Sequence, residues 1–267
     1  MSTNSTTGAP MILIDRPEPE IVRICMNRPQ SFNALSSEMM HALQTQIDQL
    51  KTDETCRVIV LCATGKAFSS GHDLKEMNSN PERDFYEKLF AQCSSMMMSL
   101  QTLPQPVIAQ VDGIATAAGC QLVAMCDLAI ASNTSKFAVS GINYGLFCAT
   151  PSVGLSRNVS RKVAMEMLLT GDFISADQAV EKGLLNRSVP VADLEREVLS
   201  MCLKITEKPS VAIALGKTLF YKQAEMGLAS AYQLAGQVMA CNMMDPSAQE
   251  GFQAFLDKRS PTWMLAR

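Results

Sequence analysis

Residues 115–127 read A-T-A-A-G-C-Q-L-V-A-M-C-D. Five small residues come first, and an apolar run follows them in which Gln121 is the one uncharged polar side chain. Small residues let ligand atoms approach the backbone, and the unpaired N–H groups at a helix start favour negative charge. The stretch therefore predicts a ligand-binding loop and a short helix that begins near Ala118. Close packing of a helix against a neighbour would need the same small residues, so the stretch alone leaves both interpretations open.

Strands and helices alternate on both sides of this stretch. The apolar runs expected to be strands cover residues 11–15, 21–26, 57–63, 106–111 and 127–131, with a turn expected at 16–19. Apolar residues recur at helical spacing over 36–50, and a second helix is expected near 84–103. Alternation of this kind is built by right-handed crossovers and indicates an α/β fold.

Beyond about residue 152 the strands nearly vanish. Residues 175–178, S-A-D-Q, have the form of a capping box at a helix start, and Gly183 stands where that helix should end. Residues 191–257 are expected to be mostly helical, and they are rich in apolar side chains. We expect this end to pack on the rest of the protein or on another subunit.

Composition limits the class of protein. The 267 residues are 47% hydrophobic and 18% charged, as in a soluble globular enzyme, and the net charge of −3 gives no reason to expect nucleic acid or membrane as a partner. Nine cysteines without a C-x-x-C pair indicate reduced thiols, and His41 and His72 lack partners at metal-ligand spacing, so no metal site is expected. Residues 1–10 are expected to be disordered and resemble neither a secretory signal nor a mitochondrial presequence, which favours a cytoplasmic location.

A second loop has the same character as the first. Residues 65–75, G-K-A-F-S-S-G-H-D-L-K, follow a buried apolar strand, where α/β proteins often place ligand contacts. Its glycines and serines permit a tight turn with exposed N–H groups. One N–H donor from each loop would form an oxyanion hole for a carbonyl that gains negative charge. Each loop by itself could equally be an ordinary strand-to-helix connection.

Five segments together resemble a known family. They are N-R-P-Q-S-F-N-A-L (27–35), A-F-S-S-G-H-D-L-K-E-M (67–77), Q-P-V-I-A-Q-V-D-G-I-A-T-A-A-G-C-Q-L-V-A-M-C-D (105–127), L-L-T-G-D-F-I-S-A-D-Q-A-V-E-K-G-L (168–184) and E-G-F-Q-A-F-L-D-K-R (250–259). In this order they resemble the crotonase, or enoyl-CoA hydratase/isomerase, superfamily. S-S-G-H-D-L-K-E and T-A-A-G-C-Q-L are most similar to its enoyl-CoA hydratase domain-containing group.

The resemblance implies a fold and an assembly. The expected fold is α/β, a crotonase-type spiral of ββα units with a helical C-terminal trimerisation region, assembled as a homotrimer or as a hexamer of two trimers. Residues 11–200 would form the spiral core with an acyl-CoA site, and residues 201–267 the helical C-terminal region.

The resemblance also implies site residues. The thioester carbonyl of an acyl-CoA would be held by the backbone N–H groups of His72 and Ala118. Coenzyme A is then part of the substrate and no separate cofactor is expected. The positions that match the family's coenzyme A contacts are Arg28, Ala67, Asp73, Leu74, Lys75 and Lys258, with Arg259 as a neighbouring candidate.

Two positions depart from the family pattern. Hydratases of the family use two glutamates as general base and general acid, and the matching positions here are Gln121 and Gly141. Neither an amide nor a glycine exchanges a proton near neutral pH. The one-glutamate isomerase pattern also needs its base at Gly141, and no aspartate nucleophile of a dehalogenase is available because residues 128–165 contain no carboxylate. Standard hydration is therefore expected to be absent or very slow.

Three interpretations stay open. The chain is an acyl-CoA enzyme with relocated groups, or it uses bound water or a small anion such as bicarbonate in the space left by Gly141, or it is a non-catalytic acyl-CoA-binding or scaffold protein. The candidates for relocated groups are His72, Asp73, Asn143, Tyr144 and Cys148. In all three interpretations the apolar residues 145–151 could line an acyl pocket. The serine peptidases of this fold need a Ser–His–Asp set, for which the sequence gives no evidence.

Overall fold

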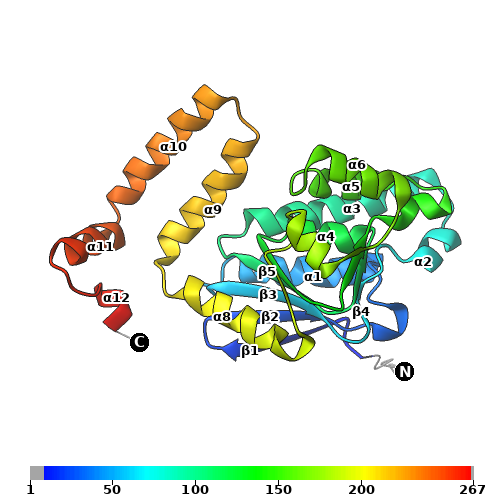
Figure 1. Cartoon of the computed structure of the whole chain (residues 1–267), viewed down its shortest axis with the longest axis horizontal. Helices are drawn as coiled ribbons and strands as arrows, with labels where there is room; N and C mark the ends of the chain where they lie inside the picture. Colours follow the sequence, from blue (N-terminus) through cyan, green and yellow to red (C-terminus); the bar gives the residue numbers. More distant parts are fainter. Residues whose placement is uncertain (1–8, 266–267) are drawn as a thin grey trace, which may run out of the picture.

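The computed structural model describes residues 9–265, shown in Figure 1. The disorder expected for residues 1–10 falls almost wholly outside this range. Two sheets and their helices form the body of the molecule, and the last helices extend from it as an arm (Figure 1).

The larger sheet has six strands in the order β1-β2-β3-β5-β7-β10. Their bounds are Ile12–Glu18 (β1), Ile21–Met26 (β2), Val58–Ala63 (β3), Val107–Val111 (β5), Leu128–Ser132 (β7) and Arg187–Val189 (β10). Only β1 and β2 pair antiparallel, and the other neighbours are parallel. The strands expected from the sequence are confirmed, and no end is displaced by more than three residues.

One expectation in this sheet is wrong. The chain was expected to turn at residues 16–19, but β1 continues through Pro17 to Glu18. A proline is tolerated there because β1 lies at the edge of the sheet, where the missing N–H is not needed by a second neighbour. The pairing with β2 also shifts between Asp15 and Glu18, as at a bulge.

The smaller sheet has four short strands in the order β4-β6-β8-β9. They are Ala67–Ser69 (β4), Ile114–Thr116 (β6), Lys136–Ala138 (β8) and Ile174–Ser175 (β9). Strands β4 and β6 lie inside stretches that the sequence presented as loops. Two or three residues are too few to display a strand's alternation, so their pairing partners were not visible in the sequence.

The pairs β3–β4, β5–β6 and β7–β8 each give one strand to the larger sheet and one to the smaller sheet. Helices follow each pair, which confirms the expected spiral of ββα units. The helices of this body are α1 (Ser37–Leu50), α2 (Leu74–Ser79), α3 (Arg83–Thr102), α4 (Ala118–Met125), α5 (Ala149–Leu155), α6 (Arg161–Thr170), α7 (Ala176–Glu181) and α8 (Leu194–Thr206).

Local sequence explains where these helices begin and end. The Ser36 side chain accepts from the Met39 N–H at the start of α1, whose buried face is formed by Met39, Met40, Leu43, Ile47 and Leu50. The capping box expected for α7 is present, with Ser175 and Gln178 bonding reciprocally. Gly183, with φ of 87°, follows this helix as expected.

Both faces of the larger sheet are buried. Helices α1, α3 and α4 cover one face with the main hydrophobic core. Helix α8 covers the other, where Val198 and Cys202 pack on side chains of β2, β3, β5 and β7. The boundary expected at residue 200 thus falls inside α8, and the region that leaves the body begins after this helix.

The arm consists of α9 (Ser210–Ala224), α10 (Leu228–Met243), α11 (Pro246–Leu256) and α12 (Thr262–Leu265). Figure 1 shows it reaching away from both sheets. Its exposed apolar side chains include Phe220, Leu228, Tyr232, Met239, Met244, Phe252, Phe255 and Leu256. An apolar surface of this extent is typical of a face that packs on another protein surface.

A buried ion pair fixes the start of the arm to the body. The Lys217 ammonium of α9 donates to Asp127 Oδ2 at 2.7 Å and to the Leu100 and Gln105 carbonyls at 2.7 and 2.8 Å. The Tyr221 hydroxyl donates to Asp127 Oδ1 at 2.8 Å. Burial lowers the pKa of Lys217, and Asp127 opposes that shift.

Candidate functional site

The loops that follow β4 and β6 are packed directly against each other. Gly71 has φ of 90°, and a Cβ added to it would lie 2.9 Å from Ala117 Cβ and 3.1 Å from the Ala118 nitrogen. A Cβ on Gly119 would lie 2.3 Å from the Ser69 carbonyl oxygen. Glycine at both positions is what allows the two backbones to approach so closely.

Each loop presents one backbone N–H. His72 and Leu35 form a parallel bridge, in which the Gly71 carbonyl accepts from the Leu35 N–H at 2.7 Å. In such a bridge Leu35 bonds to the neighbours of His72 and not to His72 itself, so the His72 N–H faces away from Leu35. Ala118 is the first residue of α4, whose N–H has no partner within the helix. Within residues 9–265 neither group donates to a protein acceptor.

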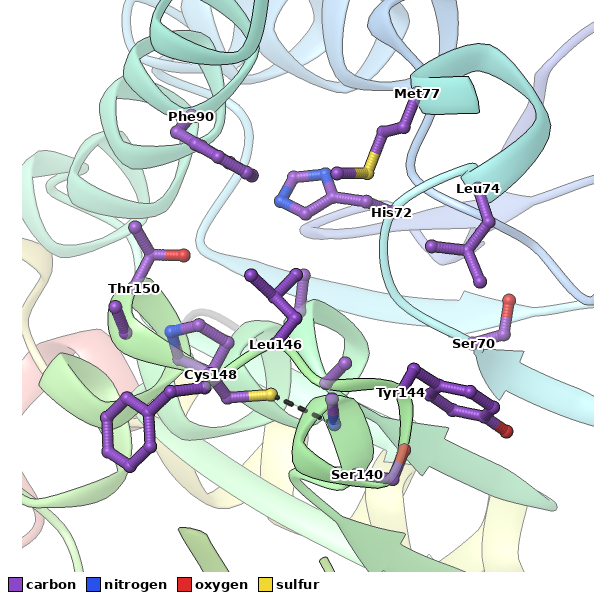
Figure 2. Close-up of a pocket in the computed structure, with 16 residues that line it drawn as sticks. Ser70, His72, Leu74, Met77, Phe90, Ser140, Tyr144, Leu146, Cys148 and Thr150 are labelled. Carbon is purple, nitrogen blue, oxygen red and sulfur yellow. Dashed lines mark hydrogen bonds between the residues drawn. The ribbon is translucent and has the colours of Figure 1, made fainter. Parts of the chain in front are cut away.

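A cavity of about 190 Å³ lies beside these two residues (Figure 2). Its lining is Ser70, His72, Leu74, Met77, Phe90, Ala117, Ala118, Ser140, Gly141, Tyr144 and residues 146–151. None of these side chains is a carboxylate, an ammonium or a guanidinium group. The cavity is therefore suited to an apolar group whose polar end meets backbone N–H donors.

The His72 imidazole lies in this cavity with Met77 and Phe90 nearby (Figure 2). Its Nδ1 lies 3.4 Å from the Leu35 carbonyl oxygen, and its Nε2 is buried without a partner among the residues that the structure describes. The ring meets Phe90 edge-on, with centroids 5.4 Å apart. Burial lowers the pKa of His72, which keeps the ring neutral at neutral pH.

Gln121 is 5% exposed in α4 and does not belong to the cavity lining. Its Oε1 has no hydrogen-bond partner within the described range. The side chain of Gln121 is thus buried outside the cavity lining.

Gly141 lines the cavity, but the space beside it is filled. A Cβ at this position would lie 2.6 Å from the Leu146 carbonyl oxygen and 2.8 Å from Cys148 Sγ. The Gly141 N–H donates to Cys148 Sγ at 3.3 Å (dashed in Figure 2), and burial raises the pKa of that thiol. The sequence suggested free space here for water or a small anion. In the direction that a side chain would take, Leu146 and Cys148 occupy it instead.

The candidates for relocated groups divide into two sets. His72, Tyr144 and Cys148 line the cavity. Asp73 caps α2, with its Oδ1 accepting from the Lys75 and Glu76 N–H groups at 3.0 and 3.3 Å. The Asn143 amide donates to the Gly171 carbonyl at 3.4 Å and lies outside the lining.

One of the expected coenzyme A contacts, Leu74, lines the cavity, and two others are joined to each other through a buried side chain. Asn33 joins two of them, because its Oδ1 accepts from the Arg28 N–H and its Nδ2 donates to the Ala67 carbonyl, both at 2.8 Å. Leu74 lines the cavity, and Lys75 follows it on α2. The side chains of Arg28 and Lys75 form no ion pair within the described residues.

Lys258 is not brought to the cavity of its own chain. It follows α11 on the arm, on the far side of the molecule from α2 (Figure 1). Its neighbour Arg259 makes two hydrogen bonds to the Glu250 carboxylate, at 2.7 and 2.9 Å. Arg259 is therefore already paired.

Sequence reasoning missed part of the lining. Met77 and Phe90 form the wall around His72, and Ser70 and Ser140 lie lower in the cavity (Figure 2). Helical spacing indicated that Phe90 lies on a helix, but not that its ring faces a ligand cavity. In residues 9–265 no three His, Cys, Asp or Glu side chains come together as metal ligands, and no helix is long and apolar enough to cross a bilayer.

Comparison with known proteins gives matches over nearly the whole chain. The family model described as "Enoyl-CoA hydratase/isomerase" matches residues 17–265. Human enoyl-CoA hydratase domain-containing protein 3, mitochondrial, is 47% identical over 243 residues, covering 91% of this chain and 80% of that protein. Its crystal structure has a TM-score of 0.91 at 45% identity, covering 95% of this chain and 100% of that one. The crystal structure of an enoyl-CoA hydratase from Mycobacterium smegmatis has a TM-score of 0.94 at 59% identity, covering 95% and 99% of the two chains.

Proposed function

Because this chain belongs to the enoyl-CoA hydratase/isomerase family and has its crotonase fold, we propose that it binds an acyl-CoA thioester in the cavity. The thioester carbonyl would accept hydrogen bonds from the backbone N–H groups of His72 and Ala118. The observation that supports this most is that both residues line one apolar cavity and that their N–H groups have no acceptor among residues 9–265. Residues 146–151 would contact the acyl chain.

The two donors would polarise the thioester. When a nucleophile adds at C3, or a proton leaves C2, negative charge moves onto the thioester oxygen. Fixed N–H donors at that oxygen stabilise the charge without having to reorient, and one such donor contributes about 3 to 4 kcal/mol to a barrier. The donors are backbone groups, so they do not depend on which side chain stands at either position.

Fast hydration of an enoyl-CoA is not part of the proposal. Adding water across C2–C3 requires a base for the water and an acid for C2, and each contributes about 10²- to 10⁴-fold. Gln121 and Gly141 stand where the family resemblance places the two glutamates. The second candidate function is a non-catalytic acyl-CoA-binding or scaffold protein, and the lack of any carboxylate in the lining favours it.

We further propose where the rest of the ligand and the assembly would lie. Arg28, Ala67, Asp73, Leu74 and Lys75 would border the coenzyme A part. The arm would pack on other copies in a homotrimer or a dimer of trimers, and Lys258 would then reach a neighbour's ligand. A cytoplasmic location stays a prediction, and the human relative is named as a mitochondrial protein.

Calorimetric titration with butyryl-CoA tests the binding proposal. We expect saturable binding to the native protein, and weaker binding after Thr150→Trp, which fills the cavity. Thr170→Trp, at the exposed end of α6, is the matched control and should bind as the native protein does. Equal affinity in both variants would place the ligand elsewhere. Hydration of crotonyl-CoA, followed by loss of the enoyl absorbance, should be at or near the uncatalysed rate.

A further inference from the structure

One ring nitrogen in the cavity lacks a partner. His72 Nε2 is buried and makes no hydrogen bond within the described residues, although its ring is otherwise packed against Phe90. An unpaired buried polar atom costs stability, so such atoms are rare in native proteins unless something else satisfies them. In Figure 2 the ring lies above Leu146 and between Met77 and Phe90, facing the cavity.

The surroundings of the ring decide which role Nε2 can take. The Leu35 carbonyl beside Nδ1 can only accept, so a ring proton on Nδ1 is the arrangement that lets the two groups hydrogen-bond. In the neutral ring Nε2 then has a lone pair and no proton. The missing partner must be a hydrogen-bond donor.

The position of the ring points to the acyl part of the ligand. His72 supplies both a backbone N–H and its side chain to one cavity. A thioester oxygen at the N–H would leave the acyl carbons in the space that the imidazole borders. The other groups around the ring there are apolar: Met77, Phe90 and Leu146.

We propose that His72 Nε2 accepts a hydrogen bond from a hydroxyl group on the acyl chain, which makes His72 a specificity-determining residue for hydroxyacyl-CoA thioesters. The inference rests on the proposed binding of an acyl-CoA in this cavity. The oxyanion contact uses the backbone of His72 and the hydroxyl contact uses its side chain, so the two can be separated by substitution.

The test compares butyryl-CoA with 3-hydroxybutyryl-CoA and 4-hydroxybutyryl-CoA by calorimetric titration. A hydrogen bond to an otherwise unpaired acceptor is expected to favour one hydroxylated ester by about 5- to 30-fold. His72→Phe keeps a ring and the backbone N–H but removes Nε2. The ratio of the affinities for the hydroxylated and the plain ester, measured within this variant, should fall to about one. His72→Gln, which retains an acceptor, should restore part of the preference. His41→Phe, on the exposed face of α1, is the matched control.

The outcomes separate this inference from the proposed function. If butyryl-CoA binds but neither hydroxylated ester is preferred, the inference is wrong and the proposed function stands. An unchanged preference in His72→Phe would also overturn it. If no ester binds at all, the proposed function fails and the inference with it.

A spectroscopic measurement on the native protein needs no variant. The chain has only two histidines, so the imidazole nitrogens can be assigned by ¹H–¹⁵N correlation. We expect free His72 to show a proton on Nδ1 and an unprotonated Nε2. The preferred hydroxylated ester should shift the Nε2 resonance upfield, as for an acceptor that gains a hydrogen bond, and butyryl-CoA should not. Equal shifts with both esters would contradict the proposed contact.

Discussion

Replacing Gly141 with alanine tests whether the space beside this position is filled. The added Cβ would lie 2.6 Å from the Leu146 carbonyl oxygen and 2.8 Å from Cys148 Sγ, so the wall formed by residues 146–151 must move. A backbone carbonyl cannot rotate away as a flexible side chain can. Overpacking of this kind costs about 1 to 3 kcal/mol. For a chain of this size that corresponds to a melting temperature lower by about 2 to 12 °C.

Gly236→Ala in α10 is the matched control. No atom of the described residues lies within 4 Å of a Cβ at Gly236, and alanine is the better helix former by about 0.5 to 1 kcal/mol. This change should therefore be neutral or stabilising. The two variants are melted at equal protein concentration, because assembly contributes to apparent stability. Butyryl-CoA should also bind more weakly to Gly141→Ala, since residues 146–151 line the cavity.

A double variant tests whether the short contacts of the added Cβ cause the loss of stability. Cys148→Ala combined with Gly141→Ala removes one of the two short contacts and should recover part of the lost stability, while the Leu146 contact remains. If Gly141→Ala melts at the native temperature and binds butyryl-CoA normally, the wall formed by residues 146–151 is not tightly packed against position 141. The space beside position 141 would then accept at least a methyl group.

Two further substitutions test the buried ion pair of the arm and the backbone conformation before α4. Lys217→Met leaves Asp127 buried without its cation and should lower the free energy of unfolding by about 3 to 5 kcal/mol in urea titrations. Lys222 is exposed on the same helix, and Lys222→Met should change the free energy of unfolding by less than about 0.5 kcal/mol. Equal effects of the two substitutions would show that Lys217 does not anchor the arm. Ala117 has φ of 51° and ψ of −121°, a region that favours glycine, so Ala117→Gly should raise the unfolding free energy by about 1 kcal/mol. A lower melting temperature in Ala117→Gly would show that the backbone there is unstrained.

The sequence predicted those parts of the site that depend on local chemistry. The start of α4 at Ala118 followed from the small residues before it, and the capping box of α7 followed from Ser175 and Gln178. The small residues around Gly119 are compatible with close packing of a helix against a neighbour, but the sequence does not say which neighbour. The structure shows that Gly119 of α4 packs on Ser69 at the end of β4, and that Gly71 packs on the residues that lead into α4.

The remaining features depend on contacts between distant segments. Phe90 reaches the cavity because α3 packs beside the loop of His72, which helical spacing does not reveal. The space beside Gly141 looked empty because glycine has no side chain, yet the chain returns five to seven residues later and fills it. Nothing in the local sequence marks Lys217, because its partner Asp127 lies 90 residues away and the fold buries the pair.

Isotope-edited infrared spectroscopy shows whether two backbone N–H groups polarise a bound thioester. The carbonyl stretch of butyryl-CoA labelled with ¹³C at the thioester carbon is compared free and bound. Two N–H donors at the oxygen weaken the carbonyl bond, so the bound ester should absorb at lower frequency than the free ester. The shift should persist in His72→Phe, because the donor there is the backbone. A bound ester that absorbs at the frequency of the free ester would contradict the account.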